Sequence, residues 1–344
     1  MKIAHITWSL GTGGIETMLA DIVNEQIISE KVAVYIINNY VDEDIINKIN
    51  KNCKLIFCGK KIGSKNILPI IKLNWELIKF NPDIIHIHLP GIIKLIPFIR
   101  CKKVFTIHNT HTTNQEYSHF DALYGISNAV KDYTRKQGYE SITIYNGINI
   151  SKIKSKNNFE KPSKYKILQI GRLYNPHKGQ HILLKAIKKL VYQKGVQNFI
   201  VDFIGEGPSL KELQVYVDKN NLQQYVNFVG LKSRDYIYEH LCDYHLYIQP
   251  SLSEGFGLTI AEAMVAKVPV IVSNLEGPME VINNGELGDF FTCGDYKELA
   301  SKIAAFMEKN MCVEKIHRAH EYAIKHFSVI NTANKYLYEY NKLL

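Results

Sequence analysis

The sequence has no long apolar run and no paired cysteines, and both absences narrow the class of protein. No stretch of 18 or more apolar residues occurs, so no membrane-spanning helix is expected. The apolar start at Ile3–Trp8 is too short, and too soon followed by glycines, for a signal peptide. The six cysteines form no CxxC pair, which predicts neither a zinc site nor a disulfide framework and fits a cytoplasmic location.

A dinucleotide-binding fingerprint is also missing. The turn after the first expected strand, Trp8–Glu16, reads WSLGTGGIE and does not fit GxGxxG. The second expected strand runs into Asn38 and Asn39, where a ribose-binding acid would stand. We therefore expect no classical dinucleotide site.

The chain has a formal net charge of +9 at pH 7, and acidic residues are scarce in two of its regions. Residues 45–105 hold 12 Lys and Arg against Glu76 and Asp83, and residues 151–200 hold 12 against Glu160. Such blocks suit phosphates or an anionic membrane surface, and a solvated basic face explains them equally well. Nucleic acid is not among the expected partners.

Apolar runs alternate with helical patterns along the whole chain, which predicts parallel sheets covered on both faces. Helices are expected at Glu16–Ile28, Leu68–Phe80 and Asn128–Lys136. The expected strands of the first half are Ile3–Trp8, Val32–Ile37, Lys54–Phe57, Ile84–Ile87, Lys103–Ile107, Ala122–Ile126 and Ile142–Tyr145. Those of the second half are Lys166–Ile170, Phe199–Ile204, Val226–Val229, His245–Ile248 and Val270–Val272.

A polar, Lys-rich break divides the two halves and predicts a linker at residues 151–164. The fold class is therefore α/β, with two doubly wound, Rossmann-like domains at residues 1–150 and 165–327. Residues 328–344 carry apolar side chains at helical spacing and predict a closing helix that packs toward the first domain. Ligands of such folds bind beyond the carboxyl ends of the strands, so the cleft between the domains is the expected site.

The segment Pro250–Glu262 follows an expected strand and opens a helix near Gly257. Free backbone N–H groups at that helix start suit an anion. Glu254 and Glu262 frame the turn, and carboxylates are good acceptors for sugar hydroxyls. The pattern favours a sugar nucleotide, against the alternative of two ordinary helix-associated acids.

A second segment, Gly171–Gly179, also follows an expected strand. Arg172 offers a planar fork and Lys178 a point charge, which together could neutralise a diphosphate without a metal. Among the histidines, His108 follows an expected strand and should face the cleft. His86 and His88 share one face of another strand, but no third ligand is evident, so we favour a structural role over a metal pair.

Taken together, the motifs resemble retaining glycosyltransferases of family 4, which have the GT-B fold. The resemblance covers essentially the whole chain. It rests on E-x7-E at Glu254 and Glu262, PS-x-x-EGFG at Pro250–Gly257, GRL…KG at Gly171–Leu173 and Lys178–Gly179, and the shorter matches Gly13–Gly14, Gly205–Pro208 and Asn146–Gly147. Lys267 departs from the pattern, since the family usually has glycine there.

The resemblance implies a role for each matched residue. On the donor side, Arg172 and Lys178 would hold the diphosphate, Glu262 the ribose and Glu254 the sugar hydroxyls. Gly13 and Gly14, Glu206 and the backbone of Gly255, Phe256, Gly257 and Leu258 would complete the donor site. On the acceptor side stand Gly14, His108 and Asn146. His108, Glu254, Arg172 and Lys178 form the expected catalytic set.

The implied reaction moves a hexose or N-acetylhexosamine from a nucleotide-diphosphate sugar, with a UDP-sugar the expected donor, to a saccharide. The resemblance also implies that this transfer needs no metal and no other cofactor. A lipid-linked acceptor in bacterial surface polysaccharide synthesis (capsule, O-antigen or exopolysaccharide) is the working hypothesis. The stretch Gly91–Lys103 interleaves cations with apolar residues, which suits peripheral docking on an anionic leaflet. A buried core element explains it equally well. A nucleotide-sugar epimerase and a non-catalytic donor-binding subunit remain the alternative functions.

Overall fold

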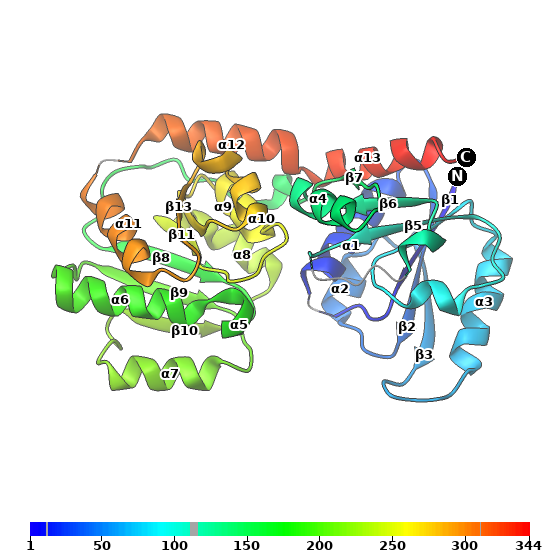
Figure 1. The fold of residues 1–344 in the computed structure, drawn as a ribbon, viewed down its shortest axis with the longest axis horizontal. Helices are drawn as coiled ribbons and strands as arrows, with labels where there is room; N and C mark the ends of the chain where they lie inside the picture. The colour runs from blue at the N-terminus through cyan, green and yellow to red at the C-terminus, as the bar shows by residue number, and fades with distance from the viewer. Residues whose placement is uncertain (12, 111–115, 310) are drawn as a thin grey trace. The chain divides into compact units, whose positions relative to one another are not determined.

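The computed structural model describes residues 1–11, 13–110, 116–309 and 311–344, and it divides into two compact units (Figure 1). The first unit comprises Met1–Ile148 and Phe327–Leu344, and the second comprises Asn149–His326. Residues 151–164, expected as a linker, belong to the second unit. There the backbone amide of Lys156 donates to the carbonyl of Ala266 at 3.0 Å, and the Lys156 side chain is buried.

The first unit is built on a seven-stranded parallel sheet in the order β3-β2-β1-β4-β5-β6-β7. Its strands are β1 (Lys2–Thr7), β2 (Lys31–Asn38), β3 (Lys54–Lys60), β4 (Ile84–Ile87), β5 (Lys102–Ile107), β6 (Ala122–Gly125) and β7 (Ile142–Thr143). Its helices are α1 (Gly14–Gln26), α2 (Glu43–Lys48), α3 (Leu68–Phe80), α4 (Asn128–Lys136) and α13 (Val329–Asn341). The order in which strands are added reverses between β1 and β4, and ligands of such parallel sheets bind at this switch point.

The C-terminal helix α13 is part of the first unit. It contacts α1, and its Tyr336 and Tyr340 are buried in a core that includes Ile3 of β1 and Val104 of β5. Gly147 fits closely against this helix, because a Cβ there would lie 2.5 Å from the Cα of Val329. The core of the first unit therefore includes residues from the C-terminal end of the chain.

The second unit has a six-stranded parallel sheet in the order β10-β9-β8-β11-β12-β13. Its strands are β8 (Tyr165–Ile170), β9 (Phe199–Ile204), β10 (Val226–Gly230), β11 (Leu246–Gln249), β12 (Val270–Ser273) and β13 (Asp289–Phe291). Its helices are α5 (Asn175–Lys178), α6 (Gln180–Lys194), α7 (Leu210–Lys219), α8 (Arg234–His240), α9 (Leu258–Val265), α10 (Glu276–Val281), α11 (Tyr296–Glu308) and α12 (Val313–Phe327), whose last residue falls in the first unit.

These two sheets confirm the α/β, doubly wound architecture. Every expected strand is present within a few residues, and most of them are buried apolar runs, although β3 alternates between buried and exposed residues and β7 is largely exposed. The short edge strand β13 was not expected, since two of its three residues are exposed. Within the described ranges, no helix is long and apolar enough to cross a lipid bilayer.

Candidate functional site

The two motif segments of the second unit meet at the carboxyl edge of its sheet. Gly171–Gly179 follows β8 and Pro250–Gly257 follows β11, and these two strands are neighbours at the reversal point. The amides of Leu252 and Ser253 both donate to the carbonyl of His177, at 2.8 and 3.1 Å. The backbone itself therefore joins the two segments.

Gly179 makes this close approach possible. Its φ is +63°, and a Cβ there would lie 1.9 Å from the carbonyl oxygen of Pro250. A side chain would be strained at that φ and would also push the two segments apart. The glycine therefore fixes Lys178, its neighbour, beside the loop that carries Glu254.

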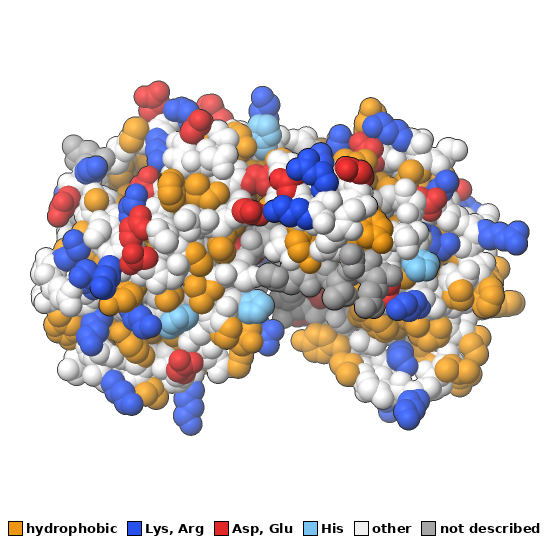
Figure 2. All heavy atoms as spheres, in the orientation of Figure 1, with side chains coloured by type: hydrophobic (Ala, Val, Ile, Leu, Met, Phe, Trp, Pro, Cys, Tyr) orange, Lys and Arg blue, Asp and Glu red, His pale blue; other side chains and the backbone are white. Residues whose placement is uncertain are grey.

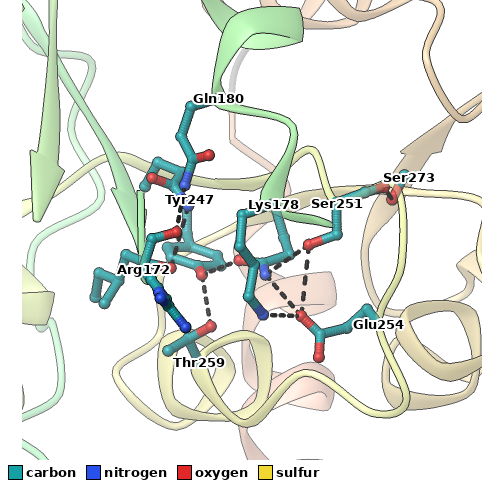
Figure 3. Close-up of polar contacts among 11 residues, drawn as sticks. Arg172, Lys178, Gln180, Tyr247, Ser251, Glu254, Thr259 and Ser273 are labelled. Carbon is teal, nitrogen blue, oxygen red and sulfur yellow. Dashed lines mark hydrogen bonds and ion pairs between the residues drawn. The ribbon is translucent and has the colours of Figure 1, made fainter. Parts of the chain in front are cut away.

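The centre of the site is the ion pair between Lys178 and Glu254 (Figure 3). Lys178 Nζ lies 2.6 Å from Glu254 Oε2, and both side chains are largely but not fully buried. The same oxygen accepts from Gln249 Nε2 at 3.0 Å and from Ser251 Oγ at 3.4 Å. Three donors on one oxygen hold the carboxylate in place and leave Oε1 as its second acceptor atom.

Gln249 is a site residue that the sequence interpretation missed, and Ser251, although part of the quoted PS-x-x-EGFG motif, was given no role there. Gln249 is held in turn by Tyr247, whose hydroxyl donates to Gln249 Oε1 and also contacts Thr259 Oγ1 at 2.6 Å on α9 (Figure 3). Gln249 Nε2 also donates to Ser251 Oγ at 2.9 Å. Gln249 is the last residue of β11, so its place at a strand end was the available signal.

Arg172 stands in the loop after β8 with its side chain exposed to solvent. Its guanidinium lies 5.7 Å from the centre of the Tyr174 ring, and its carbonyl accepts from Gln180 Nε2 at 3.0 Å. In the described part of the chain, no carboxylate pairs with this guanidinium. Arg172 thus offers an unneutralised positive charge on the loop that leads to Lys178.

The loop after β9 packs against the Arg172 loop. A Cβ on Gly205 would lie 2.2 Å from the carbonyl oxygen of Gly171, and Leu173 donates from its amide to the carbonyl of Glu206 at 2.9 Å. The Glu206 side chain is exposed. The structure therefore brings the expected donor-side segments of this unit together at one edge of the sheet.

The helix α9 begins after Gly257, as expected, but Glu262 is more enclosed than its expected role suggested. Glu262 is 1% exposed and forms an ion pair with Arg234 of α8. Arg234 is held by the hydroxyl of Tyr238, 2.7 Å from its Nε. Nothing in the sequence indicated Arg234, which lies 28 residues before its partner.

Residues 255–258, between Glu254 and the first turn of α9, differ in which of their groups could contact a ligand. Phe256 is 1% exposed, so its side chain belongs to the core and only its backbone could meet a ligand. Gly255 lies under α10, since a Cβ on Gly277 would be 2.6 Å from its carbonyl atoms. Leu258 is the first residue of α9, and the N–H groups of this first turn are the expected anion-binding groups.

The acceptor-side candidates Gly14, His108 and Asn146 all belong to the first unit, as does the donor-side candidate Gly13. Gly13 caps the N-terminus of α1, and its carbonyl accepts from the amide and the hydroxyl of Thr17. Gly14 is the first residue of that helix, and Asn146 is 6% exposed in the segment after β7. His108 directly follows β5, at the carboxyl edge of the sheet.

His108 is half-buried and carries a neutral imidazole. Burial lowers its pKa to about 4. Both of its ring nitrogens are inaccessible to solvent and meet no partner within the described ranges. A neutral imidazole can donate from one nitrogen and accept at the other, so His108 is suited to hydrogen-bond a hydroxyl group.

His86 and His88 have a third partner, His5, that the sequence interpretation did not find. The order of the sheet places β1 beside β4, with His5 opposite His86. One potential ligand nitrogen from each of the three rings lies within 4.8 Å of the others, so the structure supplies a third potential ligand that was not evident in the sequence. All three side chains are almost completely buried.

Hydrogen bonds engage five of the six ring nitrogens in this cluster. His5 contacts Gln26 at 2.7 Å and His88 at 3.0 Å, while His86 contacts Thr106 at 2.7 Å and Tyr340 at 2.6 Å. Burial lowers the pKa of His5 to about 4, and it lowers those of His86 and His88 as well. These contacts favour a neutral polar network that links β1, β4 and β5 to α1 and α13.

Comparison with known proteins gives matches along nearly the whole chain. Residues 150–326 match the family described as glycosyl transferases group 1, and residues 12–152 match glycosyltransferase family 4. Protein CapJ of Staphylococcus aureus is 28% identical over 72% of this chain and 70% of its own length. The phosphatidyl-myo-inositol mannosyltransferase of Mycobacterium leprae is 24% identical over 75% of this chain and 73% of its own.

Solved structures show the same fold. HepE from Anabaena, crystallised with UDP and glucose, matches with a TM-score of 0.83 at 22% identity, and the match covers 100% of both chains. WaaB, a lipopolysaccharide outer core galactosyltransferase, matches with a TM-score of 0.76 at 20% identity, over 99% of this chain and 100% of its own. The expected GT-B fold class is confirmed.

Proposed function

This chain belongs to the group 1 glycosyl transferases, and from that premise we propose that it transfers a sugar from a nucleotide-diphosphate donor to a saccharide acceptor with retention of anomeric configuration. The observation that carries the proposal is the joined pair of loops after β8 and β11. They place a diphosphate-binding cation, Lys178, in contact with a hydroxyl-binding carboxylate, Glu254.

The donor diphosphate is assigned to Arg172, Lys178 and the N-terminal turn of α9. Two cations and a helix start can neutralise this group without a metal ion. Oε1 of Glu254 then accepts from hydroxyls of the donor sugar, and Glu262 accepts from the ribose. Glu206, the backbone of residues 255–258 and the Gly13–Gly14 turn complete the donor site in this proposal.

The transfer breaks the bond between the anomeric carbon and the diphosphate oxygen, and the electron pair leaves with the diphosphate. The acceptor hydroxyl forms the new bond on the same face of the short-lived oxocarbenium-like sugar, and its proton passes to the departing diphosphate. Stabilisation of that developing negative charge by Arg172 and Lys178 is the largest electrostatic contribution. His108, with Gly14 and Asn146, serves the acceptor side and hydrogen-bonds the transferred sugar.

The donor is proposed to be a UDP-hexose or UDP-N-acetylhexosamine, and the acceptor a lipid-linked saccharide of bacterial surface polysaccharide synthesis. HepE, which has the same fold, was crystallised with UDP and glucose. The mycobacterial relative is named for transfer to phosphatidyl-myo-inositol, which is a lipid. These two likenesses support a UDP-sugar and a membrane-bound acceptor.

The test is incubation of the purified chain with UDP-, GDP- and ADP-sugars, followed by NMR of the products. Release of nucleoside diphosphate, with a product of the same anomeric configuration as the donor, is expected, and EDTA should not abolish it. An isomerised nucleotide sugar without diphosphate release would identify an epimerase. Saturable donor binding without turnover, across donors and acceptors, would identify a non-catalytic subunit.

A further inference from the structure

The outward face of α3 is unusual for a helix at a protein surface. Helices at a surface normally turn polar residues to water. Here five large apolar side chains at the N-terminus and along one face of α3 are each more than half exposed. They are Ile67 at 67%, Leu68 at 65%, Ile71 at 56%, Trp75 at 58% and Ile78 at 60%, and we call them the α3 apolar face.

This exposure is not a result of poor packing. The opposite side of α3 carries its own buried stripe, Pro69, Leu73 and Leu77, at the spacing of one helical turn. That stripe faces the sheet, where α3 contacts β2 and β3. The helix is therefore apolar on two sides, and only one of them has a partner within this chain.

The α3 apolar face lies in a lysine-rich segment of the chain. Residues 54–80 contain six lysines and one acid, Glu76. Glu76 is engaged by Lys54 at 3.1 Å and by Lys79 at 3.9 Å. Lys72 and Lys79 are both exposed. Lys72 Nζ donates to the carbonyl of Phe57 at 2.7 Å, and Lys79 Nζ lies 5.1 Å from the centre of the Trp75 ring. Figure 2 shows orange apolar side chains with blue basic ones among them where α3 lies in Figure 1.

The Gly91–Lys103 stretch, considered above for membrane docking, contributes less than expected. Ile92, Ile93, Ile96 and Ile99 are all buried, so a core role explains most of its apolar residues. Phe98, in contrast, is 87% exposed. This stretch is tied to α3, because Asn74 Nδ2 donates to the carbonyl of Leu95 at 2.8 Å.

We propose that the α3 apolar face binds an anionic lipid bilayer, with α3 lying in the plane of the interface. Aliphatic residues would enter the acyl boundary, Trp75 would sit at the headgroup level, and Lys72 and Lys79 would meet the anionic headgroups. A second copy of this chain fits less well, because its matching lysines would repel these. Membrane binding does not depend on the proposed transfer reaction, but it would hold the enzyme where lipid-linked acceptors are found.

Liposome flotation of the full chain tests the proposal. Vesicles of phosphatidylcholine with phosphatidylglycerol should carry the protein upward at physiological salt, and phosphatidylcholine alone should carry much less. Ile71→Ser with Trp75→Ser should reduce binding at least roughly tenfold, as expected for two buried apolar side chains. Lys72→Glu with Lys79→Glu should also reduce it. The matched control is Ile28→Ser, at an isolated apolar residue that is 78% exposed in the same unit.

Trp75 provides a second readout, because the chain has only one other tryptophan, Trp8. In a Trp8→Phe background, its emission should shift to the blue when anionic vesicles are added. Donor turnover without lipid should be unchanged in the α3 variants, which separates this test from that of the transfer reaction. Equal binding by wild type and α3 variants would overturn the proposal. So would a wild-type dimer that these substitutions dissociate, without lipid binding, because the face would then be a self-interface.

Discussion

Lys178 Nζ and Glu254 Oε2 lie 2.6 Å apart, although the residues are 76 positions apart in the chain. The contact joins the loop after β8 to the loop after β11. Within the expected site, the Glu254 carboxylate positions the Lys178 ammonium, and Gln249 and Ser251 position the carboxylate through hydrogen bonds.

Loss of either candidate diphosphate-binding cation should impair turnover more than folding. Lys178→Ala and Arg172→Ala should each lower kcat by about 10²-fold or more, because the departing diphosphate loses a charge partner. Steady-state release of nucleoside diphosphate measures the effect. Lys211→Ala, at an exposed lysine of α7 in the same unit, is the matched control. Near-normal turnover of Arg172→Ala would refute its assigned role.

The buried pair Arg234–Glu262 should affect both stability and nucleotide affinity. Arg234→Ala removes a partner from a carboxylate that is 1% exposed, and should destabilise the protein by about 3 kcal/mol. The double variant Arg234→Met with Glu262→Gln should be more stable than Arg234→Ala, since no charge is then buried. Urea unfolding measures both variants.

Glu262→Gln tests the proposed ribose contact separately. It should weaken binding of the nucleoside diphosphate roughly tenfold, because a charged acceptor is replaced by a neutral one. Isothermal titration gives the affinity. Unchanged affinity would confine Glu262 to a structural role with Arg234.

The histidine network predicts a loss of stability in mild acid. Burial lowers the pKa of His5 to about 4, and the pKa values of His86 and His88 are also lowered from 6.5. Between these values the unfolded chain binds more protons than the folded one. The stabilisation is therefore complete above pH 6.5 and is lost as the pH falls toward 4, with a slope of at most about 1.4 kcal/mol per pH unit and group.

Hydrogen exchange of the β1 and β4 amides at pH 7 and pH 5 measures this loss in the first unit. His86→Gln should make the dependence on pH shallower, because one titrating group is removed. The exposed His317→Gln should leave it unchanged. Equal stability of wild type at the two pH values would contradict the account of the network.

Lys267 should be a site of backbone strain. It stands where the resemblance expects glycine, and its φ is +58°, in the left-handed region. Lys267→Gly should stabilise the protein by about 1 kcal/mol by removing the Cβ from that conformation. Thermal unfolding of the two proteins measures the difference, and Lys267→Ala, which retains a Cβ, should show no such gain.

The fold and the local motifs were predictable from sequence because their signals are local. A buried apolar run shows a strand such as β8 or β11, and residues directly after strand ends fall at one edge of a parallel sheet. Arg172, Lys178 and Glu254 were found in this way. Arg234, His5 and Tyr340 were not, because each reaches its partner only through tertiary packing. The α3 apolar face was also missed, because periodicity identifies a helix without saying which of its two apolar sides is covered.

The most direct test of the central claim is donor binding by the site around Lys178 and Glu254. Titration of the full chain with UDP-, GDP- and ADP-sugars should show saturable binding of at least one. Lys178→Ala and Arg172→Ala should each weaken that binding at least roughly tenfold, and Lys211→Ala should leave it intact. Absence of binding to every donor, or binding that neither substitution weakens, would contradict the claim.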